Sequence, residues 1–433
     1  MKMMKMMKKT KQLTAFPFTV LAAVILAALA PAGCPQPEGD DGKPARTATP
    51  RAEITSISKS PGLPQKRAEF TLTNILDGGQ AGDWKVYDEK TGGTALETVS
   101  AQFSDQTATL SLIAAGDELA AGTYYVSVTE AGKSESGRLG LTLTPYTPVR
   151  IGLLTDPHYA DINPNGNRHF RDALFKVRDA VTYFNTQPLD FIAELGDLKD
   201  KHATDALLTT GYLGTIEGEL RKANVEVAHV LGNHDMDMLS KAQFLSHITN
   251  LPGAVYPDNA VDKSYYSFVL RGIKFIVLDA CFTKNNDPYK GDAAGTNYTY
   301  KEARVPPKEQ HWLKMELASH YPVIILAHQL LDFWNKPAAD PDTVVLNAAE
   351  VVQILEDSGK VAAVFQGHHH AGHYSTRNGI HYVTLKGMVE GPYPSSTSYA
   401  VATIDASLNI TWDGFGNEPD RTLAHPAPEG STD

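Results

Sequence analysis

The chain has 433 residues, 42% of them hydrophobic and 21% charged, which is the balance of a globular protein and excludes wholesale disorder. At about 150 residues per domain, this length suffices for two or three domains. The formal net charge is −11, and it falls to −16 without the five lysines of residues 1–33, so we expect no nucleic acid as a standing partner.

Residues 1–33 have the order of an export signal peptide. A basic run, MKMMKMMKKTKQ, precedes the apolar run LTAFPFTVLAAVILAALAPA. An uncleaved membrane anchor is the alternative, because the apolar run approaches the ~20 residues that span a bilayer. The small residues Ala30, Ala32 and Gly33 at its end favour cleavage.

Cys34 is a candidate site of lipidation. The stretch APAGC resembles a bacterial lipobox, although Pro31 stands where that motif prefers leucine. The sequence therefore predicts an exported protein, either an envelope lipoprotein tethered through Cys34 or, with cleavage after Ala32, a periplasmic or secreted one. The second cysteine, Cys281, lies in the apolar run FIVLDACF, so we expect no intramolecular disulfide.

Two segments follow the signal before the character of the sequence changes. Residues 34–50 are rich in Pro, Gly and charge without periodicity, which is typical of a flexible linker. Residues 51–146 contain short alternating runs separated by turn residues, which predict a small all-β immunoglobulin-like sandwich. This stretch offers no cluster with metal-ligand spacing, so we interpret it as a spacer or docking module whose partner stays open.

Residues 147–424 alternate short apolar strands with amphipathic helices, and residues 425–433 are expected to form a disordered tail. Strands are predicted in RIGLLT, LDFIAELG, VEVAHVLG, IKFIVLDA, YPVIILAH and VAAVFQG. Helices are predicted in RHFRDALFKVRDAVTYFN, KEQHWLKMEL and NAAEVVQILEDSG. Alternation of this kind indicates an α/β domain built in layers.

Polar residues follow five of these strands at their carboxyl ends, where open α/β sheets place their chemistry. One such motif alone is as typical of a turn or a helix cap as of a functional site, but five of them in order indicate a site. The residues that follow the strands, in chain order, are Asp156 and His158; Asp197 and Asp200; Asn233, His234 and Asp235; His328; and His368, His369 and His370.

Imidazoles and carboxylates in this combination fit two adjacent divalent metals. They suit Mn, Fe, Co, Ni or Zn, and the lack of cysteine disfavours a structural zinc site. One carboxylate can bridge two cations about 3.5–4 Å apart. Asn233 can add a neutral amide oxygen, which keeps the site from carrying too many anions.

The motifs D-x-H, G-D-x-x-D, G-N-H-D, a lone His and G-H-x-H, in this order over residues 156–370, resemble the signature of the calcineurin-like metallophosphoesterases. The resemblance implies a four-layer β-sandwich flanked by helices, preceded here by the small immunoglobulin-like domain. It implies that one metal is held by Asp156, His158, Asp197 and His370, and that Asp197 bridges to a second metal held by Asn233, His328 and His368. It makes His234 a catalytic group near the leaving group, oriented by Asp200, and gives His369 no ligand role.

A narrower resemblance joins the loops DPHYADINPNGNRHFRDAL, YYSFVLRGIKFIVLDA and GIHYVTLKGMVEG to the manganese-dependent ADP-ribose/CDP-alcohol diphosphatases. It implies two divalent metal ions, Mn, Fe or Zn with Mn favoured, and a nucleotide-linked substrate such as ADP-ribose or a CDP-alcohol. The export signal and the β-domain depart from the eukaryotic members of that group.

The expected reaction is hydrolysis of a phosphoester or phosphoanhydride by a metal-bridging hydroxide. Arg168 and His169, after the turn NPNGN, are candidate contacts to the far phosphate or else an exposed helical turn. A cyclic-nucleotide phosphodiesterase or a general phosphomonoesterase shares the metal motifs and stays open. A surface-anchored binding module with an inactive fold is disfavoured because every motif residue is kept, and a purple acid phosphatase because Asp200 replaces its metal-binding tyrosine.

Overall fold

The structure is a computed structural model that describes residues 147–425 except 258–262 and 320, together with residues 89–93 and the strands between Ser56 and Leu143. The predicted signal peptide, the linker with Cys34, and the tail beyond His425 lie outside the described residues. In the part of the chain that is described, no helix combines the length and apolar character needed to cross a membrane.

The N-terminal strands form two antiparallel sheets. One sheet has the order β1 (Ser56–Lys59), β2 (Arg67–Thr73), β5 (Thr107–Ile113), β4 (Thr98–Ser104), and the other has the order β3 (Asp83–Tyr87), β6 (Gly122–Thr129), β7 (Leu139–Leu143). Six of these strands overlap the alternating runs RAEITSIS, RAEFTLTN, DWKVYDE, TATLSLIA, GTYYVSVTEAG and RLGLTLTP, while no such run predicts β4. That these strands form a small all-β immunoglobulin-like domain stays a prediction.

Two mixed six-stranded sheets form the centre of the C-terminal domain. The first has the order β10 (Val227–His229), β9 (Phe191–Glu194), β8 (Val149–Leu154), β19 (Ser398–Ile404), β20 (Ile410–Gly416), β21 (Arg421–Leu423). The second has the order β11 (Tyr266–Leu270), β12 (Ile273–Val277), β15 (Val323–Leu326), β16 (Val361–Gln366), β18 (Ile380–Thr384), β17 (His373–Arg377). Strands β8, β9 and β10 are parallel, as are β12, β15, β16 and β18.

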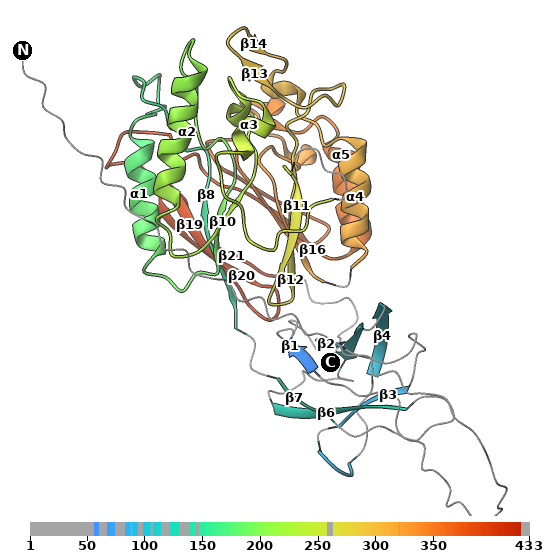
Figure 1. Cartoon of the computed structure of the whole chain (residues 1–433). Coiled ribbons are helices and arrows are strands. Elements are labelled where there is room, and N and C mark those ends of the chain that lie inside the picture. The colour runs from blue at the N-terminus through green and yellow to red at the C-terminus, as the bar shows by residue number, and fades with distance from the viewer. Residues whose placement is uncertain are drawn as a thin grey trace, which may run out of the picture. The chain divides into compact units, whose positions relative to one another are not determined.

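Helices cover the outer faces of both sheets. Helices α1 (Ala173–Phe184) and α2 (Ala206–Leu220) lie on one side, and α4 (Pro307–Leu317) and α5 (Ala348–Ser358) lie on the other, with the sheets between them (Figure 1). One apolar cluster joins the two sheets, and each helix pair has a cluster of its own against its sheet. The domain is therefore built in the four layers that the sequence predicts.

The alternation of side chains along each strand produces these layers. In β8, Ile151 and Leu153 enter the cluster between the sheets, whereas Leu154 packs on the helix side. In β15, Ile324 and Leu326 likewise face the other sheet, and Ile325 faces α4 and α5. Both faces of these strands are buried, which is why each reads as a continuous apolar run.

Two differences from the predicted elements concern α2 and the last strands. Helix α2 contains three glycines and weak amphipathic patterning, so the sequence gives little helical signal there. Asp205 caps it, because its carboxylate accepts hydrogen bonds from the backbone of Leu207 and Leu208. Strands β11 and β17 to β21 were not singled out; β18 joins β16 in parallel, and the others extend the sheets by antiparallel pairing.

Candidate metal centre

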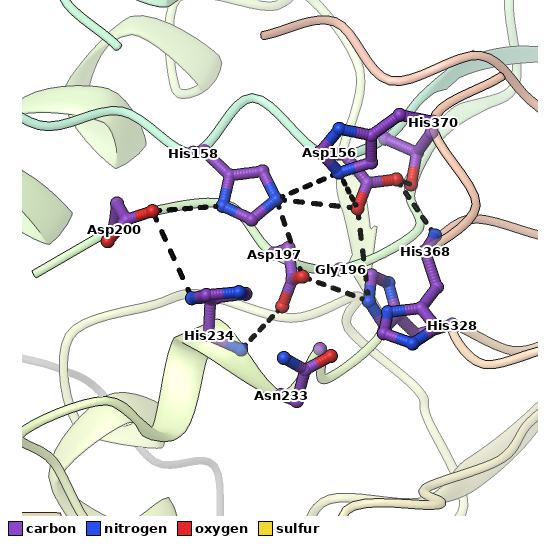
Figure 2. A network of polar contacts seen from close by, with 12 residues as sticks. Asp156, His158, Gly196, Asp197, Asp200, Asn233, His234, His328, His368 and His370 are labelled. Atoms are coloured by element: carbon purple, nitrogen blue, oxygen red, sulfur yellow. Dashed lines mark hydrogen bonds and ion pairs between the residues drawn. The ribbon is translucent and has the colours of Figure 1, made fainter. Parts of the chain in front are cut away.

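The loops that follow β8, β9, β10, β15 and β16 bring their polar residues to one place. Parallel strands in each sheet end at the same edge, and the two packed sheets present these edges side by side. Figure 2 shows the imidazoles of His158, His328, His368 and His370 gathered around the carboxylates of Asp156 and Asp197. The sequence-predicted ligands thus meet, although they span more than two hundred residues.

A first group consists of Asp156, His158 and His370, whose ligand atoms lie within 4.8 Å of one another. The Nε2 atom of His370 lies 3.3 Å from Asp156 Oδ1 and 3.2 Å from His158 Nε2. Asp156 and His158 are fully buried. Burial alone would raise the pKa of Asp156, but His370 and His328 hold it well below its usual range, so this carboxylate is ionised.

A second group consists of Asp197, His328 and His368, and Asn233 adjoins it. Asp197 Oδ2 lies 3.1 Å from His328 Nε2 and 3.4 Å from His158 Nε2. The same carboxylate oxygen therefore faces an imidazole of each group. This is the position that a bridging ligand requires.

Buried polar atoms without hydrogen bonds show that these residues fit metal ions. In the described part of the chain, Asn233 Oδ1 and His368 Nε2 are buried without a hydrogen bond, and Asp156 Oδ1 and His328 Nε2 have only ion-pair contacts within the two groups. Each belongs to a sequence-predicted ligand, and a buried polar atom without a hydrogen bond is costly. Divalent cations would satisfy all of them, with nitrogen and oxygen donors only.

The other ring nitrogens of the histidines are held by partners. His158 Nδ1 lies 3.3 Å from Asp200 Oδ2, His370 Nδ1 lies 2.7 Å from Glu390 Oε1, and His328 Nδ1 donates to the carbonyl of Leu195 at 2.7 Å. Such partners fix the ring and leave Nε2 facing the centre. Glu390 was not predicted as a functional residue, because it lies twenty residues after His370 and carries no local motif.

Asp235 ties two of the loops together. Its buried carboxylate accepts hydrogen bonds from the backbone N–H groups of Asp197 at 3.0 Å, Leu198 at 2.9 Å and Gly232 at 2.8 Å. A Cβ at Gly232 would lie 2.2 Å from the backbone nitrogen of Asp197, so only glycine allows this approach. The motif residues next to the ligands thus set the spacing between the loops.

The one-residue spacing of His368 and His370 predicts an extended segment with both side chains on one face, but the backbone at the ligands is different. Strand β16 ends at Gln366, and His368 adopts a left-handed φ of 67°, as do Asp156 (51°), His158 (47°) and Asp197 (55°). An extended segment with His368 and His370 on one face is therefore wrong. The turn nevertheless sends them to different groups, while His369 belongs to neither and its ring lies 6.5 Å from that of His373.

His234 lies beside both groups with a partner that differs from the expected one. Its Nδ1 is 2.8 Å from Asp237 Oδ2 and 3.9 Å from Asp200 Oδ2, so Asp237 is the nearer carboxylate and Asp200 contacts His158. Burial lowers the pKa of His234, but Asp197 and the contact with Asp237 outweigh it and raise the pKa to about 9. The hydroxyl of Tyr298 donates to Asp237 Oδ1 at 3.0 Å.

The two candidate substrate contacts separate in the structure. Arg168 lines a cavity of about 640 Å³ whose wall also includes Asp200 and Glu390. His169 does not line this cavity, and its Nδ1 lies 3.3 Å from Asp172 just before α1. Only Arg168 therefore keeps a position suited to substrate.

The chain matches known proteins over the region that carries these residues. Residues 149–372 match the family model of the calcineurin-like phosphoesterases. A manganese-dependent ADP-ribose/CDP-alcohol diphosphatase from Danio rerio is 26% identical over 316 residues, which cover 64% of this chain and 98% of the relative. The protein of the same name from Xenopus tropicalis is 23% identical, covering 67% of this chain and 97% of the relative.

A solved structure agrees with the fold. The crystal structure of a dimetal phosphatase from Danio rerio covers 65% of this chain and 100% of its own, with a TM-score of 0.56 and 23% sequence identity. The family model confirms the resemblance to the calcineurin-like phosphoesterases, and the relatives confirm the resemblance to the manganese-dependent diphosphatases. The individual ligand assignments stay predictions, now with a geometry that suits them.

Proposed function

Since the chain belongs to the calcineurin-like phosphoesterase family, and is therefore a metal-dependent hydrolase, we propose that it cleaves the diphosphate bond of a nucleotide-linked substrate such as ADP-ribose or a CDP-alcohol. The observation that carries this proposal is the pair of adjacent ligand groups, in which Asp197 Oδ2 faces His158 of the first group and His328 of the second. The printed activity of the relatives supports the substrate class.

Two divalent cations, manganese by analogy with the relatives, would be held in these groups. Asp156, His158, Asp197 and His370 would hold one, and Asp197, Asn233, His328 and His368 the other. When bound, such a pair supplies an acidified water as nucleophile and neutralises the charge on the phosphoryl oxygens. Most of these side chains are buried, which keeps bulk water from competing with them for the metals.

His234 would assist the departure of the leaving group. Its backbone N–H donates to Asp197 Oδ1 at 2.6 Å, which fixes the residue beside the bridging carboxylate. Its imidazole, which contacts Asp237, would donate a proton to the bridging oxygen as the P–O bond breaks. Asp200 and Glu390 would keep His158 and His370 in position rather than touch the substrate.

We also propose that the protein is exported and that its N-terminal strands form an immunoglobulin-like spacer or docking domain. The basic, apolar and small-residue order of residues 1–33 supports export, and Cys34 supports a lipid tether. Mass spectrometry of protein from the native membrane tests this, since processing should remove Met1 and leave a lipidated Cys34 at the N-terminus. A chain that keeps Met1 would refute the signal, and an unmodified Cys34 would refute the tether.

The proposed activity is tested by assaying manganese-loaded protein against ADP-ribose, CDP-choline, cyclic AMP and a simple phosphomonoester. We expect the two diphosphates to be cleaved with the highest kcat/KM. Preference for cyclic AMP or for the monoester would replace the proposed substrate class with one of the alternatives that share the metal motifs.

A further inference from the structure

The cavity beside the metal centre has features that the proposed chemistry does not yet use. Its volume of about 640 Å³ lies within the roughly 300–1,000 Å³ of small-molecule pockets. Three amide side chains, Asn163, Asn165 and Asn167, and two cations, Arg168 and Lys201, line it. A wall rich in neutral donors and cations suits a polar anionic ligand.

Two shared residues place this cavity next to the first ligand group. Asp200 and Glu390 line the cavity, and each also contacts an imidazole of that group, His158 and His370 respectively. Lys201 lies on the His234 side, because its Nζ is 3.6 Å from Asp237 Oδ1. A substrate whose leaving group departs past His234 would therefore extend into the cavity.

The carboxylates of the wall are already engaged. Glu390 Oε1 contacts His370, and Glu390 Oε2 accepts a hydrogen bond from Asn167 at 2.6 Å. Asp200 Oδ2 contacts His158, and Asp200 Oδ1 accepts from the backbone of Lys201 at 2.7 Å. Because their oxygens are directed to these partners, the side chains left to meet an anion are Arg168 and the amides of Asn163 and Asn165, with Lys201 beside Asp237.

Arg168 stands on a rigid support. Its backbone exchanges two hydrogen bonds with Asn165, at 3.1 and 3.0 Å, around Gly166. Asn167 and His169 on either side are bonded to the loop that carries Glu390, through Gly391 N–H at 2.8 Å and the Val389 carbonyl at 2.9 Å. Buried Lys176 holds that loop by donating to the carbonyls of Met388, Glu390 and Gly391. The backbone that carries Arg168 is therefore already ordered, which lowers the entropy cost of holding a ligand there.

We propose that this cavity is the subsite for the leaving phosphate of a diphosphate substrate, and that Arg168, assisted by Lys201, makes the enzyme prefer leaving groups that carry this second phosphate. The inference rests on the proposed function. In the reaction, the water oxygen forms a bond to the attacked phosphorus while the bond from that phosphorus to the bridging oxygen breaks. The electron pair stays on the bridging oxygen, so the departing phosphate gains negative charge unless it takes a proton. A cation beside it stabilises that charge.

The test compares two substrates on full-length, manganese-loaded protein. ADP-ribose has a second phosphate, and bis(p-nitrophenyl) phosphate does not. For Arg168→Ala we expect kcat/KM for ADP-ribose to fall about 10²-fold, a loss typical of one transition-state donor, with little change for the diester. For Arg168→Lys, kcat/KM for ADP-ribose should fall less, because lysine keeps the positive charge but lacks the planar guanidinium. Arg178→Ala, which alters an arginine of α1 paired with Glu219 outside the cavity, is the matched control and should leave both substrates unchanged.

A binding measurement separates recognition from turnover. Calorimetry should show that wild type binds α,β-methylene-ADP more tightly than AMP and that Arg168→Ala narrows this difference. Equal losses for ADP-ribose and the diester, or an unchanged preference for α,β-methylene-ADP, would overturn the subsite while leaving the proposed function intact. If wild type cleaves the diester but neither ADP-ribose nor CDP-choline, the proposed function itself fails.

Discussion

Replacement of Asp237 by Asn is expected to slow the hydrolysis of substrates with poor leaving groups without removing metal. The motif G-D-x-x-D predicts Asp200 as the partner of His234, but the structure puts Asp237 Oδ2 at 2.8 Å and Asp200 Oδ2 at 3.9 Å from His234 Nδ1. The two carboxylates therefore have separable duties, and paired variants distinguish them.

The expected magnitude follows from these contacts. Burial lowers the pKa of His234, but Asp197 and then Asp237 raise it to about 9 in the protein without metal. Bound cations lower this pKa, while the carboxylate of Asp237 favours the protonated imidazole in either state. Asn keeps the size but removes the charge, which lowers this pKa and moves the alkaline limb of the pH profile to lower pH. General acid catalysis contributes about 10²–10⁴-fold, so we expect kcat for ADP-ribose to fall about 10²-fold. The kcat for bis(p-nitrophenyl) phosphate should fall far less, because its leaving group needs little protonation.

Asp200→Asn should behave differently. Asp200 Oδ2 lies 3.3 Å from His158 Nδ1, so the substitution weakens the support of a predicted ligand and should reduce manganese affinity about 10–100-fold. The assay is kcat for both substrates across pH, with bound manganese measured by elemental analysis and folding checked by thermal unfolding. If Asp200→Asn slows turnover at full metal content while Asp237→Asn is neutral, the structural assignment is wrong and the motif-based one is right.

The second prediction concerns the three consecutive histidines. His370→Ala and His368→Ala should each bind less metal and lose at least about 10²-fold in activity, whereas His369→Ala should lose little activity because His369 belongs to no ligand group. Equal losses of activity in all three variants would refute the assignment. A third concerns protons. Burial lowers the pKa of His328, but Asp197 and Asp156 outweigh it and raise the pKa to about 10. Metal binding at pH 7 should therefore release on the order of one proton, and metal affinity should rise with pH. Calorimetry in buffers of different ionisation enthalpy measures the protons released, and the absence of proton release would contradict the prediction. A fourth is that protein beginning at Thr147, if circular dichroism shows it folded, should keep its activity; loss of activity with both metals bound would show that the N-terminal strands complete the site.

Much of the catalytic domain could be predicted because its signals are local. The strand runs are apolar on both faces since both faces are buried, and the ligands follow at their ends. Asp156, His158 and Asp197 therefore stand out by position, and the order of the motifs shows which belong together. Helix α2 lacks such a signal, because its glycines and weak patterning obscure a helix that packing stabilises.

The residues that hold the ligands in position could not be predicted in the same way. Glu390 and Leu195 act through contacts with His370 and His328 that span 20 and 133 residues. The left-handed backbone at Asp156, His158, Asp197 and His368 costs on the order of 1 kcal/mol each and depends on the surrounding loops. Asp237 lies only three residues after His234, so its distance was foreseeable, but the sequence does not reveal which of two nearby carboxylates the imidazole turns towards.

A manganese titration of metal-stripped, full-length protein tests whether the chain is the two-metal hydrolase of nucleotide-linked diphosphates that we propose. Bound manganese and cleavage of ADP-ribose would be measured on the same samples. We expect binding to saturate at two ions per chain and AMP formation to rise as the second site fills. Saturation at a single ion, or two bound ions with ADP-ribose left intact, would contradict it.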